Sequence, residues 1–112
     1  MAGVIEVNDA SFAKEVLESD LPVMIDMWGD WCEPCKALDP VIEQIARDYD
    51  GRLKVCRVDV GSNPRTANAC HVGTLPTLLF VRDGEIVGHH IGPAASEVLA
   101  TKIADHLQLS LR

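Results

Sequence analysis

The run Val23–Trp28 constrains the fold more than any other segment, because it is apolar at every position except Asp26. A strand with apolar side chains on both faces is typical of the centre of a parallel sheet that is covered by helices. Parallel neighbours also need long crossover connections, which are usually helical. We therefore expect an α/β fold with Val23–Trp28 as a central strand.

The rest of the sequence predicts strands and helices in alternation. Strands are predicted at Val4–Val7, Leu53–Val60, Thr77–Val81 and Glu85–Ile91. Helices are predicted after an Asn8-Asp9 cap, from Cys32 to Gly51, from Ser62-Asn63-Pro64 to Cys70, and from Ser96 onward. Asp83-Gly84, between the last two strands, is a strong hairpin signal. This order implies a mixed sheet with parallel strands first, an antiparallel hairpin at one edge and helices on both faces.

The longest predicted helix begins near Cys32. Pro34 suits its first turn, where a missing N–H group costs nothing. Its predicted apolar face consists of Ala37, Leu38, Val41, Ile42 and Ile45. Pro40 is expected to interrupt and kink the helix, and Gly51 is expected to end it.

Length and charge narrow the class of protein. The chain has 112 residues, so we expect one domain over residues 1–112. A formal net charge of -7 and scattered positive charges argue against nucleic acid or an anionic membrane as a main partner. We see no secretory signal pattern and no apolar stretch of membrane-spanning length. The expected compartment is therefore a reducing cytoplasm, where cysteines seldom form structural disulfides.

Cys32 and Cys35 are the predicted reactive groups, because they join a buried strand to the start of a helix. Residues three apart on a helix lie about 5–6 Å apart at Cβ, close to the spacing that a disulfide needs. Unpaired N–H groups and the dipole at the helix start favour an anion, so they should stabilise the thiolate of Cys32. Cys35 lies one turn further in and should be more buried. This asymmetry suits a nucleophile and a resolving thiol.

Two other interpretations of the pair compete with redox chemistry: half of a zinc site, and two incidental thiols. A structural zinc site usually needs four ligands. Cys56, Cys70 and the histidines could supply them, but they form no second pair at the right spacing. Incidental thiols would rarely fall at a strand-to-helix junction between Trp31 and Lys36. We therefore favour redox chemistry and expect no metal.

The residues around the pair resemble the thioredoxin family, and the resemblance covers nearly the whole chain. The family's W-C-G-P-C-K motif appears as Trp31-Cys32-Glu33-Pro34-Cys35-Lys36, and its V-D-F-W pattern appears as Ile25-Asp26-Met27-Trp28. Leu75-Pro76-Thr77 matches the family's I-P-T, and Asp83-Gly84 and Gly92 match its hairpin turn and a later glycine. The resemblance implies a thioredoxin fold, in which four helices flank a five-stranded mixed sheet, and a cis Leu75-Pro76 bond.

The resemblance also implies a function, that of a protein-disulfide reductase acting by thiol–disulfide exchange. Cys32 would attack a client disulfide, and Cys35 would release the reduced client. Asp26 would serve Cys35 as a base through a water, and burial in an apolar strand should raise its pKa. A structural role is the alternative for Asp26. The implied partners are disulfide-bearing client proteins and a thioredoxin reductase. We expect a monomer with no cofactor beyond the redox-active disulfide.

Two further groups of residues are assigned by the resemblance. A docking surface around Cys32 would consist of Trp31, Thr74, Leu75, Pro76 and Gly92. Redox tuning is expected from Glu33, Pro34, Lys36 and Arg57. Each docking residue has a plain alternative as a packing or turn residue. Arg57 falls where the family often has a lysine close to the buried Asp, and an exposed strand charge is its alternative.

Glu33 departs from the family pattern, which has glycine between the cysteines. A carboxylate beside Cys32 disfavours the thiolate and competes for the helix start, so the protein should be a somewhat stronger reductant. Solvent screening would oppose this effect. Glu33 would alternatively select which partners dock.

The remaining cysteines and the competing functions complete the prediction. Cys56 is predicted to be a buried thiol in a strand, and Cys70 a passive thiol near the end of a short helix. A binding module with idle or metal-bound cysteines is the main competing function. An oxidase or isomerase of an export pathway is a third, which the absent signal and the proline before Cys35 argue against. A cysteine protease is not expected, because nothing marks a base.

Overall fold

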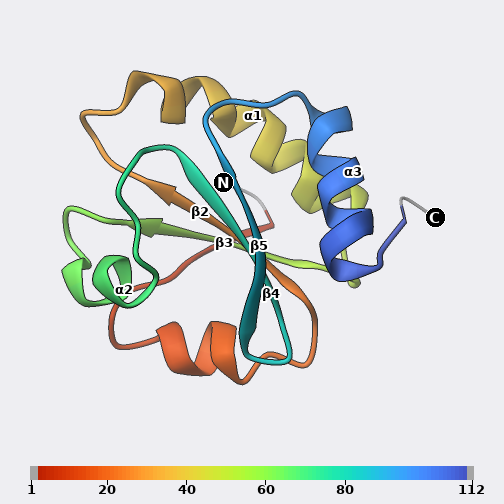
Figure 1. The fold of residues 1–112 in the computed structure, drawn as a ribbon, viewed down its shortest axis with the longest axis horizontal. Helices are drawn as coiled ribbons and strands as arrows, with labels where there is room; N and C mark the ends of the chain where they lie inside the picture. The colour runs from red at the N-terminus through yellow and green to blue at the C-terminus, as the bar shows by residue number, and fades with distance from the viewer. Residues whose placement is uncertain (1–2, 111–112) are drawn as a thin grey trace.

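A five-stranded sheet forms the centre of the computed structural model, which describes residues 3–110 (Figure 1). In spatial order the strands are β1 (Val4–Glu6), β3 (Lys54–Asp59), β2 (Val23–Trp28), β4 (Thr77–Arg82) and β5 (Glu85–Ile91). The first three are parallel to one another, whereas β4 runs antiparallel to β2 and β5 runs antiparallel to β4. The predicted mixed sheet is therefore confirmed, with β2 at its centre and the hairpin at one edge.

Four helices flank the sheet within the described residues. They are a π-helical turn η1 (Ala13–Leu17), α1 (Glu33–Asp48), α2 (Pro64–Ala69) and α3 (Ser96–Leu107). α1 and α3 cover one face, where Leu38 and Leu99 pack with Met24 of β2. η1 and the end of α2 cover the other face, where Val16 and Cys70 pack with Ile25. Figure 1 shows the two pairs on opposite sides of the sheet, as the sequence predicts.

Side chains alternate between the two faces of the sheet, and one face carries a row of charges. Successive residues of a strand point to opposite faces, so Asp26 shares the α1 face with Met24, and Ile25 points away. The register pairs Asp26 of β2 with Arg57 of β3, and Arg57 with Glu6 of β1. Glu6, Arg57 and Asp26 thus form a charged row across three strands on the α1 face.

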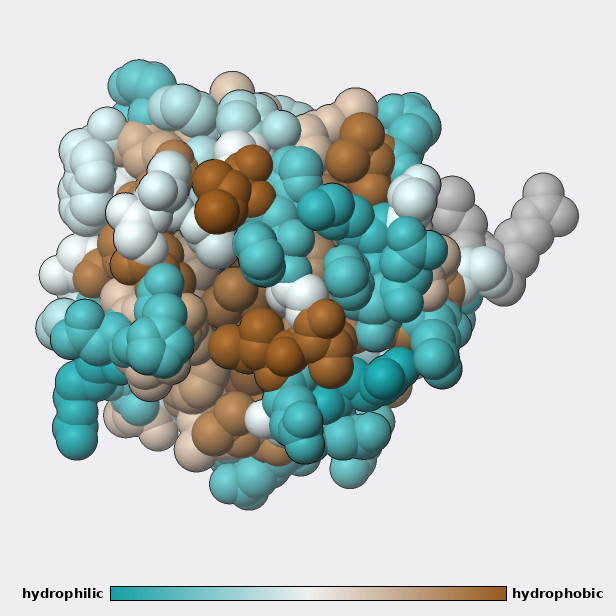
Figure 2. Space-filling view, viewed as in Figure 1, coloured by the Kyte–Doolittle hydropathy of each residue, from teal (hydrophilic) through white to brown (hydrophobic). Residues whose placement is uncertain are grey.

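The hairpin at the edge of the sheet has the predicted turn. Asp83 and Gly84 both adopt positive φ, at 52° and 78°, which a tight two-residue hairpin turn requires. The edge strand β5 leaves Ile86 and Ile91 half exposed. Figure 2 shows a largely hydrophilic surface with apolar patches, some of them over this hairpin.

The segment after Asn8 differs from the sequence prediction. It forms only the short turn η1, and Asp9 does not cap it. The Asp9 carboxylate instead accepts hydrogen bonds from the backbone N–H and the hydroxyl of Thr66, at 2.8 and 2.7 Å. Asp9 therefore ties the N-terminal segment to α2, which follows more than fifty residues later in the chain.

Two details of α1 also differ. The prediction that Ala37 belongs to the buried face is wrong, because Ala37 is exposed while Leu38, Ile42 and Ile45 are buried. Ala37 points to solvent on the side of α1 away from the sheet, whereas the buried face of the helix also includes Cys35 and Ala46. Pro40 does not interrupt the helix, which continues to Asp48.

Candidate active site

Cys32 and Cys35 lie at the junction that the sequence predicts, between β2 and α1. A turn leads into the helix, with the Cys32 N–H donating to the Gly29 carbonyl at 3.0 Å. Cys32 is the N-cap of α1, and its Sγ accepts a hydrogen bond from the Cys35 N–H at 3.2 Å. The two cysteines form a disulfide with a Cα–Cα separation of 5.3 Å. The pair can therefore open and close with little movement of the backbone.

The two cysteines differ in exposure, as expected. The exposed fraction is 7% for Cys32 and 1% for Cys35. In the reduced protein, the Cys35 N–H and the dipole of the 16-residue helix α1 would both favour a negative charge on Cys32. An approaching disulfide can reach only the sulfur of Cys32. The geometry thus leaves one outer and one inner sulfur, the asymmetry that the predicted roles of nucleophile and resolving thiol require.

Asp26 is completely buried, and none of its carboxylate oxygens has a hydrogen-bond partner among the described residues. Loss of hydration is the largest influence on this group and raises its pKa to about 7. The positive charge of Arg57 opposes the rise, whereas the carboxylates of Asp39 and Glu6 add to it. The predicted upward direction is therefore confirmed. Such a carboxyl can both accept and release a proton near neutral pH.

Arg57 is largely buried, so the alternative that it is an exposed charge on a strand is wrong. Its side chain is only 12% exposed and forms ion pairs with Glu6, at 3.3 Å from Nε, and with Asp39, at 3.9 Å from Nη2. The guanidinium also stacks over the Trp28 ring, 4.2 Å from its centroid. Arg57 therefore lies largely buried in the charged row, between the exposed Glu6 and the buried Asp26, where the resemblance puts a basic residue.

Glu33 and Lys36 lie on the exposed first turn of α1. Their side chains form an ion pair at 3.4 Å, although the Glu33 side chain is 83% exposed. Pro34 occupies the first turn without disturbing it, as predicted. The charge of Glu33 is thus partly balanced by a neighbour on the same helix.

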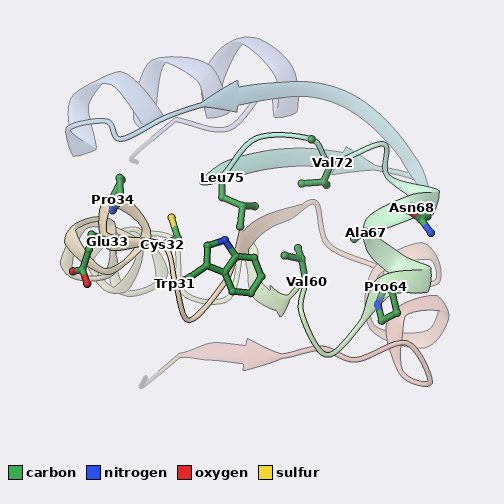
Figure 3. Close-up of a pocket in the computed structure, with 11 residues that line it drawn as sticks. Trp31, Cys32, Glu33, Pro34, Val60, Pro64, Ala67, Asn68, Val72 and Leu75 are labelled. Carbon is green, nitrogen blue, oxygen red and sulfur yellow. The ribbon is translucent and has the colours of Figure 1, made fainter.

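A groove of about 720 Å³ opens beside Cys32. Figure 3 shows Trp31 and Leu75 next to the Cys32 sulfur, with Val60 and Val72 farther along the groove toward α2. Of the predicted residues, Trp31, Cys32, Glu33, Pro34 and Leu75 line the groove. The lining also includes Val60, Pro64, Ala67, Asn68, Val72 and Gly73, which sequence reasoning missed. These residues come from the loop after β3 and from α2 and its following loop, and no local motif marks them.

Three predicted docking residues lie outside the lining of this groove. The Leu75-Pro76 bond is cis, as the resemblance implies, and Pro76 is buried. The Pro76 carbonyl accepts from the N–H of Gly92, which has a φ of 95°. Thr74 lines a neighbouring hollow with Cys70 and His71. A docking role for Thr74, Pro76 and Gly92 stays a prediction.

Cys56 is a buried thiol, as the sequence predicts, and Cys70, at the end of α2, is also free and buried. Burial raises the pKa of Cys56 to about 12 and also raises that of Cys70. Among residues 3–110, no three or more His, Cys, Asp or Glu side chains gather in a way that could hold a metal ion. Within the same range, none of the helices combines the length and apolar character needed to cross a membrane.

Comparison with known proteins adds an independent line of evidence. The family model described as Thioredoxin matches residues 3–105. A thioredoxin of Pseudomonas aeruginosa is 40% identical over 97 residues, covering 87% of this chain and 90% of that protein. Thioredoxin 1 of a Nostoc species is 36% identical over 107 residues, covering 96% of this chain and all of that protein (100%). A thioredoxin of Rickettsia conorii is 43% identical over 86 residues, or 77% of this chain and 82% of its own length.

Proposed function

The chain belongs to the thioredoxin family of protein-disulfide oxidoreductases, and on this basis we propose that it is a general reductase of disulfides in client proteins, recharged by a thioredoxin reductase. One observation carries the proposal. The outer sulfur, on Cys32, caps a helix at the edge of an open groove, while the inner sulfur, on Cys35, lies one turn away and is buried.

The proposed reaction transfers two electrons in two exchange steps. The Cys32 thiolate attacks one sulfur of the client disulfide, and the other client sulfur leaves as a thiolate. Cys35 then loses its proton and attacks the Cys32 sulfur. The Cys32–Cys35 disulfide forms, the bond to the client breaks, and the second client sulfur leaves with the electron pair. The dithiol of a reductase then restores both thiols by the same exchange.

Asp26 is the proposed base for the second step. Cys35 is buried, so its thiol needs a nearby acceptor to lose its proton. A pKa of about 7 keeps a large fraction of the Asp26 carboxyl ionised at neutral pH. The proton would pass through a water between the two groups. Asp26 lies on the face of the sheet that α1 covers, and Cys35 is a buried residue of α1.

Client docking is proposed along the groove. Trp31 and Leu75 offer apolar surface beside Cys32, and Val72 extends it along the groove, so a client segment would be held while its sulfur meets the nucleophile (Figure 3). Thr74, Pro76 and Gly92 would extend this surface. We expect the protein to act as a monomer in a reducing compartment such as the cytoplasm, and size-exclusion chromatography with light scattering tests the monomer.

Reduction of insulin with dithiothreitol as electron donor tests the proposal. The protein should speed precipitation of the freed insulin chains. Cys35→Ser, reduced beforehand and freed of dithiothreitol before mixing, should instead accumulate a mixed disulfide with the client. Replacing dithiothreitol by reductases linked to nicotinamide or to ferredoxin then identifies the donor. If insulin stays intact with every donor, the chain is a binding module rather than a reductase. A strongly oxidising reduction potential would instead indicate an oxidase or isomerase.

A further inference from the structure

The ring of Trp31 rests on two glycines from different parts of the chain. Gly29 lies in the turn after β2, and Gly61 lies in the turn after β3. A Cβ atom built on Gly29 would be 2.8 Å from Cζ2 and Cη2 of Trp31, and one built on Gly61 would be 3.0 Å from Cζ3. Cβ atoms essentially never approach other heavy atoms within 3.0 Å. The indole therefore occupies space that a Cβ atom on Gly29 would need, and a Cβ atom on Gly61 would press against the ring and require it to shift by a few tenths of an ångström.

The backbone under the ring is fixed on both sides. The Gly29 carbonyl accepts from the Cys32 N–H at 3.0 Å. The Gly61 N–H donates to Oδ1 of Asp59 at 3.0 Å, and Oδ2 of Asp59 accepts from the Ser62 hydroxyl at 3.2 Å. Neither glycine can easily retreat from an added methyl group. The indole ring can, because Trp31 is 67% exposed.

The position of the ring decides the shape of the groove. Gly29 is buried under the indole, while the other side of the ring is open to the groove beside Cys32. Figure 3 shows Trp31 between Cys32 and Val60, with Leu75 over it. A ring lifted off the glycines would fill space that a client segment needs, or would leave a gap where it offered apolar contact.

We propose that Gly29 and Gly61 are positioning residues, which hold Trp31 flat as one wall of the client groove and so govern the reaction with proteins but not with small disulfides. The proposal rests on the proposed function, because it concerns how the same sulfur meets its substrates. The two glycines touch neither the sulfurs nor the client and act only through Trp31.

A direct test of the arrangement is NMR spectroscopy of the parent protein. Nuclear Overhauser effects should connect the indole protons of Trp31 with the α protons of Gly29 and Gly61. Their absence in the folded parent protein would overturn the proposal. In Gly29→Ala and Gly61→Ala the same effects should weaken while the thermal unfolding midpoint changes little, because the exposed ring moves rather than the backbone.

The kinetic test compares two substrates in single turnover, which needs no reductase. Each variant is reduced, mixed with insulin or with hydroxyethyl disulfide, and quenched by alkylation. Gly29→Ala and Gly61→Ala should slow the insulin reaction about tenfold, as expected for displacement of an aromatic anchor. The small-disulfide reaction should stay within about twofold, because that substrate needs no groove. Equal losses on both substrates would overturn the proposal.

The Trp31→Ala background separates positioning from other effects. If the glycines act through the ring, Gly29→Ala and Gly61→Ala should add nothing to the loss that Trp31→Ala already causes. Gly73→Ala is the matched comparison, because Gly73 lines the same groove but its added Cβ would meet no atom within 4 Å. Its effect, whatever its size, should be equal with and without Trp31. Glycine effects that persist without the indole would overturn the proposal.

The outcomes also separate this inference from the proposed function. If the reduced parent protein reacts with hydroxyethyl disulfide but not with insulin, or with neither, the proposed function fails. If the parent reduces insulin and the glycine variants match it, only the positioning role fails. If one glycine variant does not fold, the positioning role is decided by the other glycine variant, by the Trp31→Ala background and by the Overhauser effects of the parent protein.

Discussion

Cys32 and Cys56 are the same residue in two environments, and the contrast explains why only one of them is placed to react. Cys32 caps α1, accepts a hydrogen bond from the Cys35 N–H and borders the groove. Cys56 lies in the middle of β3 and is fully buried, and burial raises its pKa to about 12. Because the thiolate is the nucleophile, Cys56 is inert at neutral pH. The position of a cysteine in the backbone thus decides its chemistry.

The two faces of the sheet repeat this contrast one residue apart. Cys56 points into the apolar face with Ile25, while its neighbour Arg57 points to the α1 face with Asp26. A shift of register by one residue would exchange the two sets. The charged row therefore depends on the register, because a shift of one residue would turn these charges toward the face that holds Val16, Ile25 and Cys56. The four predictions below test whether the active-site region and the apolar face behave as differently as this comparison requires.

The largest expected effect separates the two cysteines directly. Cys32→Ser should lower the rate of insulin reduction by about a thousandfold or more, because it removes the attacking sulfur. Cys56→Ala should leave the rate within about twofold, because the buried Cys56 thiol takes no part in the exchange. The insulin precipitation assay measures both. If Cys32→Ser reduced insulin at the parent rate, the proposed difference in reactivity between Cys32 and Cys56 would be wrong.

The second prediction concerns the stability cost of the charged row. The pKa of Asp26 rises from its ordinary value of 3.8 to about 7 in the folded protein. Between those two pH values the folded protein holds a proton that the unfolded chain has released. The free energy of unfolding should therefore fall as pH rises through this window and level off above pH 7.

Asp26→Asn should remove this pH dependence and raise the free energy of unfolding at pH 8 by roughly 2 to 4 kcal/mol. Urea unfolding across a pH series measures it. Asp9→Asn is the matched control with the opposite sign, because hydrogen bonds from Thr66 lower the pKa of Asp9. That carboxylate stabilises the fold above its unfolded pKa, and the contribution is lost as pH falls. If the free energy of unfolding of Asp26→Asn changed with pH in the same way as that of the parent, the raised pKa of Asp26 would not be the source of the pH dependence.

The third prediction tests the apolar face. Cys56→Ser should lower the free energy of unfolding by about 1 to 3 kcal/mol, because it buries a hydroxyl among apolar side chains. Cys70→Ser should cost less, since Cys70 lies at the end of α2 and is 8% exposed. Neither change should alter the rate of insulin reduction. If Cys56→Ser were as stable as the parent but reduced insulin more slowly, the side chain of Cys56 would have a role in the reaction, contrary to this prediction.

Local patterns predicted most of the fold and the two sulfurs. The apolar run Val23–Trp28 predicted a central strand. The spacing of Cys32 and Cys35 predicted that the two sulfurs lie close enough to form a disulfide. Both predictions depend only on the periodicity of one element. Asp26 could be predicted for the same reason, since a lone carboxylate in an apolar central strand is buried with its neighbours. The buried setting of Arg57 needed the register between β2 and β3, which no local pattern specifies.

The parts that escaped prediction all depend on loops meeting in space. Val60 and Val72 line the groove because the segments after β3 and after α2 converge on Trp31. Asp9 binds Thr66 across a separation of 57 residues, so a rule for local caps assigns it to the wrong helix. Gly61 leaves room for a ring about thirty residues earlier in the chain. None of these relations has a signal within one element.

The smallest expected effect concerns Glu33, the acidic neighbour that Cys32 has and Cys56 lacks. Glu33→Gly removes a negative charge next to the thiolate and should raise the reduction potential by about 5 to 20 mV. The effect is small because the Glu33 side chain is 83% exposed and pairs with Lys36 at 3.4 Å. Equilibration with a glutathione buffer, followed by alkylation, measures the potential. Glu33→Gln separates the charge from the added flexibility of glycine.

Salt and distance decide whether this shift is electrostatic. The shift should shrink as ionic strength rises, because an exposed charge is screened over about 10 Å at 0.1 M salt. Asp48→Asn removes the same charge from the other end of α1, more than about 20 Å along the helix axis by the rise of about 1.5 Å per residue, and should leave the potential unchanged. A fall in the potential of Glu33→Gly, or an equal shift in Asp48→Asn, would contradict the electrostatic account of Glu33.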